Sequence, residues 1–191
     1  MRLPIIVVAS SLFIAPAGIA LAQTPTDAQI ASIVVTANQV DIDAGKIAKS
    51  KASNAEVKKF AEQMITDHTG VNKQATELVT KLGVKPEDNA TSQALKTGGD
   101  KNVADLKGLK GAAFDKAYID HEVAYHQQVL DALDKTLIPS AKNAELKALL
   151  VKVRPAFEAH LAHAKQVASA LPNAGSARNA SPSNPPVSSP R

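Results

Sequence analysis

The spacing of apolar residues between Thr26 and Leu171 limits the fold of this chain more than any other feature. Apolar side chains recur at alternating steps of three and four residues, whereas strand-like alternation and hairpin dipeptides are lacking. Such steps place side chains along one face of a helix. The pattern predicts an all-α protein with four long helices, at about residues 26–48, 53–82, 112–136 and 144–171.

Capping signals and a proline give the expected ends and irregularities of these helices. Thr26 is followed three residues later by Gln29, and Ser53 by Glu56, which in both cases is the spacing of a capping box. Pro155 lies inside the fourth predicted helix. We expect a kink or a break there, because proline removes a backbone N–H and clashes with the preceding turn.

The stretch between the second and third predicted helices, residues 83–111, has a weaker helical pattern. Gly98-Gly99 and Gly108 interrupt it, so we expect a long crossover with only a turn or two of helix. Two helical pairs joined by such a crossover are typical of a ferritin-like four-helix bundle. A simple up-down-up-down bundle is the alternative.

Each predicted helix carries polar residues on its otherwise apolar stripe. These residues are Asp41 in the first helix, His68 in the second, Glu122 and His126 in the third, and His160 in the fourth. At a helical rise of about 1.5 Å per residue, all of them fall in the middle third of a bundle. The sequence therefore predicts that they form a single buried cluster.

Two interpretations of this cluster remain open, with solvated side chains as a third. Imidazole and carboxylate groups suit Fe, Mn or Zn, so the five residues are candidate metal ligands. The Glu-x-x-His motif of di-iron carboxylate proteins is missing, since Glu122 and His126 are four apart. Alternatively, the histidines and carboxylates satisfy one another by charge-assisted hydrogen bonds without a metal.

The two ends of the chain differ in composition from the part between them. Residues 1–22 combine an early arginine, an apolar run and the small-x-small sequence Ala20-Leu21-Ala22, which is typical of a secretory signal peptide. An uncleaved membrane anchor is the alternative. Residues 173–191 are rich in Ser, Pro, Asn and Ala and predict a disordered tail. We expect residues 23–172 to be the bundle domain, periplasmic or secreted after cleavage and without a stable membrane span.

Charge and cysteine content exclude several classes of function. Of 22 basic residues, Arg2 lies in the expected signal peptide and Arg178 and Arg191 in the tail, which leaves 19 against 18 acidic residues in the expected domain. With few aromatic residues as well, the domain has neither the basic field nor the stacking platform of a nucleic-acid-binding protein. The chain has no cysteine, so disulfide bonds and thiol catalysis are impossible.

Three sequence stretches resemble a known family. They are "DIDAGKIAKSKASNAEVKKFAEQMITDHTGVN", "FDKAYIDHEVAYHQQVL" and "RPAFEAHLAHA". In order and spacing they resemble bacterial secreted proteins grouped as domain of unknown function 4142, over about residues 26–171. The resemblance implies a ferritin-like bundle exported to the periplasm, often labelled a membrane protein, with no established activity. Members commonly carry Glu-x-Glu-x-Gly where this chain has the shorter carboxylate Asp41.

Two classes of function are compatible with these patterns. The first is a metal-binding or ferritin-like oxidative protein of the cell envelope. The second is a non-catalytic, structural or stress-related envelope protein with a metal-free buried network, which packs against a protein partner or forms a homo-oligomer. Neither the patterns nor the resemblance assigns a reaction.

Overall fold

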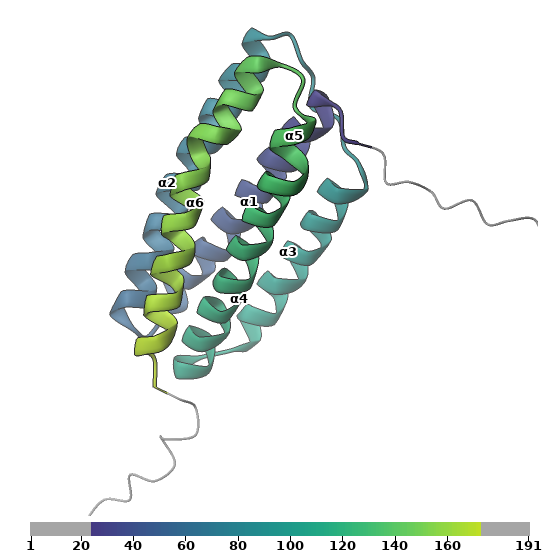
Figure 1. Ribbon diagram of the computed structural model, residues 1–191. Coiled ribbons are helices and arrows are strands. Elements are labelled where there is room, and N and C mark those ends of the chain that lie inside the picture. Colours follow the sequence, from purple (N-terminus) through teal and green to yellow (C-terminus); the bar gives the residue numbers. More distant parts are fainter. Residues whose placement is uncertain (1–23, 173–191) are drawn as a thin grey trace, which may run out of the picture.

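The computed structural model describes residues 24–172, and these form helices connected by short loops (Figure 1). No strand occurs among the described residues, which confirms the all-α prediction. The expected signal peptide and tail lie outside them. The elements are α1 (Asp27–Lys51), α2 (Ala55–Lys81), α3 (Ala90–Gly108), α4 (Gly111–Ala132), η1 (Leu133–Leu137), α5 (Ile138–Ser140) and α6 (Ala144–Ala170).

The long helices lie side by side in a bundle, and contacts at their ends give their directions (Figure 1). The carboxylate of Asp27 accepts hydrogen bonds from the N–H groups of Lys142 and Asn143, so α1 and α6 begin at the same end. Asp115 accepts bonds from the start of α2, so α2 and α4 begin together at the opposite end. The helices α1 and α6 therefore run antiparallel to α2 and α4.

The first turn of α1 matches the prediction, whereas that of α2 begins one residue later than expected. Thr26 and Gln29 form the predicted capping box. The N-cap of α2 is Asn54, whose side chain accepts from the N–H groups of Glu56 and Val57. Ser53 was predicted as the cap, but its hydroxyl and N–H both donate to the carboxylate of Asp115. Asp115, which is distant in the sequence, thus binds the Ser53 hydroxyl that the local spacing had assigned to the helix cap.

The prediction of only a turn or two of helix between α2 and α4 is wrong, because α3 has 19 residues. Asn89 caps it in a capping box with Ser92. Gly99 is buried against α1, where a Cβ would lie 2.6 Å from the nearest γ carbon of Val40. The glycine that suggested a helix break instead allows α3 to pack closely on α1.

The third predicted helix is present but changes its hydrogen bonding near its end. The α-helical part, α4, stops at Ala132, and a π-helical turn, η1, leads into the short α5. A π turn accommodates an additional residue without ending the helix. Here it keeps Leu133 and Leu137 both buried in the core.

Of the kink or break expected at Pro155, the break is not observed, since α6 is continuous from Ala144 to Ala170. Pro155 lies on the exposed surface of the helix. The carbonyl that loses its helical N–H partner belongs to Val151, a residue that is 52% exposed, so water can replace the missing donor. The helix therefore tolerates the proline.

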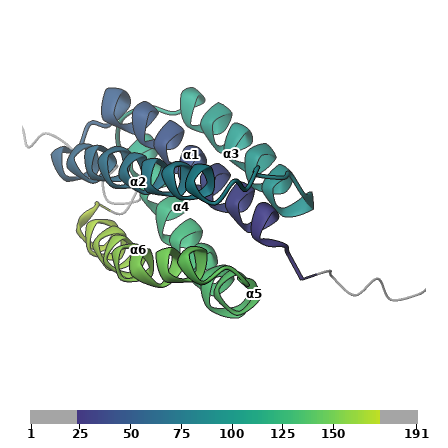
Figure 2. The same ribbon diagram turned by 90° about the horizontal axis from the view of Figure 1, so that it is seen from above.

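The buried apolar residues form two clusters. The first apolar cluster contains Leu133, Leu150 and Phe157, and the second contains Phe60, Met64 and Tyr118. Seen from above, α1 lies between α2 and α3, and α4 lies between α1 and α6 (Figure 2). None of the helices within residues 24–172 is long and apolar enough to cross a membrane.

Candidate metal centre

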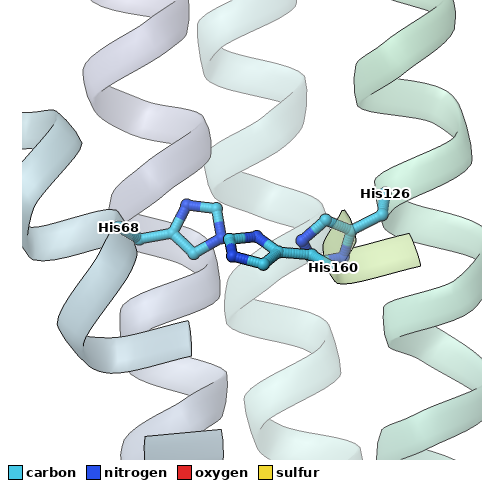
Figure 3. A group of neighbouring side chains, drawn as sticks. All are labelled: His68, His126 and His160. Carbon is cyan, nitrogen blue, oxygen red and sulfur yellow. The ribbon is translucent and has the colours of Figure 1, made fainter. Parts of the chain in front are cut away.

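The five candidate ligands lie together in a polar layer between the two apolar clusters. Asp41 on α1, His68 on α2, Glu122 and His126 on α4, and His160 on α6 are each no more than 3% exposed. Figure 3 shows the three imidazole rings pointing toward one another from α2, α4 and α6. We use the term polar layer for these five residues. Their inward placement follows from their positions on the apolar stripes.

Short distances connect the histidines of the polar layer with its carboxylates. Asp41 Oδ2 lies 3.0 Å from His68 Nε2 and 3.5 Å from His126 Nε2. Glu122 Oε2 lies 3.4 Å from the other ring nitrogen of His126. The ring centroids of His68, His126 and His160 are 5.2 to 5.7 Å apart. Asp41 is thus the carboxylate shared by two of the three imidazoles.

On each histidine, one ring nitrogen is engaged outside this centre. His68 Nδ1 lies 2.6 Å from Asn38 Oδ1, and the amide group of Asn38 donates to the carbonyl of Val34, which identifies Oδ1 as the acceptor. His126 Nδ1 lies 3.0 Å from the backbone carbonyl of Glu122. His160 Nε2 lies 2.9 Å from Asp67 Oδ2. Each of these ring nitrogens faces an acceptor, so in each neutral ring it carries the proton.

The opposite ring nitrogens point inward and have no hydrogen-bond partner among the described residues. They are His68 Nε2, His126 Nε2 and His160 Nδ1. With the outer nitrogen protonated, the inner nitrogen of a neutral imidazole carries a lone pair. In His68 this lone pair faces the Asp41 carboxylate, an arrangement that is repulsive unless a proton or a cation lies between them. The outer acceptors fix the same tautomer that histidine needs for binding a metal.

The buried groups differ in their protonation states. Burial alone would raise the pKa of Asp41, but the neighbouring imidazoles, His68 foremost, outweigh burial and lower it. Burial and the charge of Asp41 raise the pKa of Glu122 well above its usual range. Burial lowers the pKa of His160 to about 4. At neutral pH the polar layer therefore combines an ionised Asp41 with a neutral His160, and burial favours the protonated form of Glu122.

Two overlapping sets of atoms in the polar layer are close enough to share a cation. The ligand atoms of His68, His126 and His160 all lie within 4.8 Å of one another, as do those of Asp41, Glu122 and His126. Because Nδ1 of His126 is engaged by its own helix, only Nε2 is available to a metal. His126 can therefore join only one of the two sets at a time, and the three histidines form the set with free lone pairs.

Other polar side chains near the polar layer have partners of their own. Asp120 pairs with Lys116 on the exposed surface of α4, and His121 stacks on the ring of Tyr125. On α6, Glu158 pairs with Arg154, and His163 lies 3.0 Å from Gln63. These groups face away from the three inward nitrogens.

Several residues that adjoin the polar layer were not predicted from the sequence. Asn38 lies one turn before Asp41 on α1, and Asp67 directly precedes His68. Tyr118 lies one turn before Glu122, and its buried hydroxyl has no partner among the described residues. The one-turn spacing of Asn38 and Tyr118 could have identified them as neighbours of the layer. The role of Asp67 depends on the packing of α2 against α6, which the sequence does not show.

Comparisons with known proteins bear on the fold and the family. The sequence profile of a family described as domain of unknown function (DUF4142) matches residues 15–167. No curated protein matches the chain. The chain is similar to a solved structure described as CopM in the Cu(II)-bound form, with a TM-score of 0.61 and 18% sequence identity over 78% of this chain and 99% of that chain. At this identity, the likeness shows a shared helical fold.

Proposed function

The chain belongs to the DUF4142 family, and on that premise we propose that it is a metal-binding helical-bundle protein that holds one divalent transition-metal ion in the polar layer. The observation that carries the proposal is the set of three inward nitrogens on His68, His126 and His160. Among residues 24–172 none of them has a hydrogen-bond partner, and the other nitrogen of each ring is engaged. Ligating histidines typically have this arrangement.

Asp41 supplies the negative charge that favours a cation at this position. Its lowered pKa keeps it ionised at neutral pH, and it lies within 3.5 Å of two of the inward nitrogens. Glu122 adds a second carboxylate on the same side, but it must release a proton before it can bind, because its pKa is raised. Metal binding that involves Glu122 therefore releases a proton.

The donor set favours borderline metals. Imidazole nitrogen and carboxylate oxygen suit Zn, Fe and Mn, as the sequence suggested, and imidazole also suits Cu(II). The description of CopM as Cu(II)-bound adds copper to the metals to be tested. For a given site the affinity generally rises from Mn(II) through Fe(II) to Cu(II) and falls again for Zn(II). No reaction is assigned to the site.

A metal-free buried network is the second candidate. The 3.0 Å contact between His68 and Asp41 supports it, because a single proton on Nε2 would convert the contact into an ion pair. In this alternative the protein is a non-catalytic structural bundle, and the polar layer serves only to fix the packing of its helices.

Metal stoichiometry and metal-dependent stability distinguish the two candidates. After chelator treatment, the protein is titrated with Mn(II), Fe(II), Cu(II) or Zn(II) and unfolded thermally. A bound metal should reach one equivalent per chain and stabilise the fold by about 2.7 kcal/mol at a hundredfold excess over Kd. Binding should weaken as the pH falls toward about 6, because the imidazoles must be neutral.

Matched histidine variants test the same site. His68→Ala and His126→Ala should abolish the metal-induced shift, whereas His163→Ala, whose ring is bonded to Gln63, should retain it. If no metal binds stoichiometrically and both ligand variants lower stability equally with and without chelator, the metal-free network is the correct interpretation.

The cellular setting is part of the same proposal. Residues 1–22 serve as a cleaved signal peptide, residues 23–172 form the domain and residues 173–191 a tail, so that the protein works in the periplasm or outside the cell, with an envelope protein or a second copy as partner. The parallel directions of α2 and α4 support a ferritin-like arrangement in which residues 82–110 form the crossover. The intact mass of the protein from the envelope fraction tests the cleavage, because the mature chain should begin at Gln23.

A further inference from the structure

A cavity of about 200 Å³ lies beside the polar layer, lined by residues of α1, α2, α3, α4, η1 and α6. Its lining extends from exposed residues at the surface, Thr91 on α3 and Gln128 on α4, to buried residues in the first apolar cluster, such as Leu150 and Phe157. The cavity is therefore open to solvent at one end and reaches the core at the other.

The interior of this cavity is apolar. None of the lining residues is charged, and most are aliphatic. The polar groups of the two buried polar residues are already engaged, since the hydroxyl of Tyr125 donates to the carbonyl of Ala37 and the amide of Asn38 bonds to Val34 and His68. Only Thr91 and Gln128, at the exposed end, offer polar groups to a ligand.

The size and chemistry of the cavity identify its ligand. A protein cavity of about 150 Å³ lined by Leu, Ile and Phe remains dry and binds benzene or xenon. This cavity is somewhat larger, and burying a charge in it without a partner would be costly. We infer that it is a binding site for a small, neutral, apolar molecule of about the size of a singly substituted benzene ring.

The ligand site shares a wall with the polar layer. The ring of Phe157 lines the cavity, and its centroid lies 5.2 Å from that of His68 and 6.1 Å from those of His126 and His160. Asn38, which also lines the cavity, holds the outer nitrogen of His68. A bound molecule therefore contacts Asn38, which positions His68, and Phe157, which packs beside all three histidines. Its binding does not depend on a metal, so this inference and the proposed function can fail separately.

Nuclear magnetic resonance of the metal-free full chain tests the site with toluene and benzene as probes. We expect saturable, one-to-one shifts of the methyl groups of Leu133, Leu150 and Val153, together with shifts of the His68 ring. Benzoate, which has a similar ring and a negative charge, should bind at least tenfold more weakly. If neither neutral probe gives a saturable shift, the inference is wrong.

Replacement of two alanines of α4 by phenylalanine, one at a time, locates the binding. Ala132 lines the cavity, whereas Ala124 lies on the exposed surface of the same helix. Ala132→Phe fills the space and should weaken toluene binding at least tenfold, while Ala124→Phe should leave it unchanged. Equal affinity in both variants would overturn the assignment.

An enlarging variant guards against misfolding of Ala132→Phe. Leu95→Ala on α3 widens the cavity and should admit naphthalene, which the unaltered chain should bind at least tenfold more weakly. Light scattering serves as a second control. It shows whether the chain forms a dimer and whether toluene dissociates that dimer. If toluene leaves a dimer intact and the methyl groups that line the cavity are covered in it, a second copy occupies the opening and the small-molecule site is refuted.

Discussion

Gly98 and Gly99 are neighbours in α3, yet a methyl group added at Gly98 should stabilise the fold and one added at Gly99 should not. A Cβ at Gly98 would have nothing within 4 Å. Neither glycine has a positive φ, so alanine fits the backbone at both positions. Gly98→Ala should therefore stabilise the fold by about 1 kcal/mol, the difference in helix propensity between the two residues.

At Gly99 the same gain is opposed by a collision with α1. The added Cβ would lie 2.6 and 2.7 Å from the two γ carbons of Val40 and 3.1 Å from its Cβ. Rotation of the valine side chain cannot move its own Cβ, so the helices must separate. Overpacking of this kind costs about 1–3 kcal/mol, which should make Gly99→Ala neutral to destabilising, by up to about 2 kcal/mol.

Urea unfolding of the metal-free protein, followed by circular dichroism, measures both effects. Val40→Ala removes the two γ carbons, so in that background Gly99→Ala should lose most of its penalty and approach the effect of Gly98→Ala. The coupling between positions 40 and 99 should be about 1–3 kcal/mol. If both glycine variants stabilise the native chain equally, α3 does not pack on α1 as described, and the reasoning fails.

Two further predictions concern stability and pH. Asp115→Ala removes the carboxylate that accepts hydrogen bonds from Ser53 and from the N–H of Asn54 at the start of α2, and it should lower the free energy of unfolding in urea by about 2–4 kcal/mol. Asp115→Asn should cost less, and an equal effect of both variants would show that the charge of Asp115 is unimportant. Burial lowers the pKa of His160 to about 4, so as the pH falls the unfolded chain binds a proton at this residue before the folded chain does. With a chelator present, the free energy of unfolding should therefore decline by roughly 3 kcal/mol between about pH 6.5 and 4. His160→Gln should abolish this decline and His163→Gln should not; an unchanged decline in His160→Gln would assign it to other groups.

The sequence predicted the polar layer because burial in a helix depends on position along a regular repeat. Asp41, His68 and His126 each replace an apolar residue in an otherwise regular stripe, and the structure buries all three. Family membership and the all-α class were likewise predictable, from motif spacing and from the absence of strand-like patterns. That these residues bind a metal stays a prediction.

The features that sequence reasoning missed depend on contacts between distant segments. Gly99 looks like a helix breaker until Val40 is seen beside it, and Ser53 looks like a cap until Asp115 is seen to accept its hydrogen bonds. Pro155 is tolerated because its face of α6 is exposed. In each case the local signal was present, and tertiary packing changed its consequence.

The polar layer divides the apolar core, and this division determines how the bundle should open. Each of α1, α2, α4 and α6 passes from one apolar cluster to the other through the same stratum of carboxylates and imidazoles. In amide hydrogen exchange, the slowest protons should form two bands, around Phe60 and around Leu150. In the polar layer between them, the protection of amide protons from exchange should depend on the proton and cation concentrations. If a cation binds in the polar layer as proposed, it should link the two apolar clusters and make their unfolding a single event.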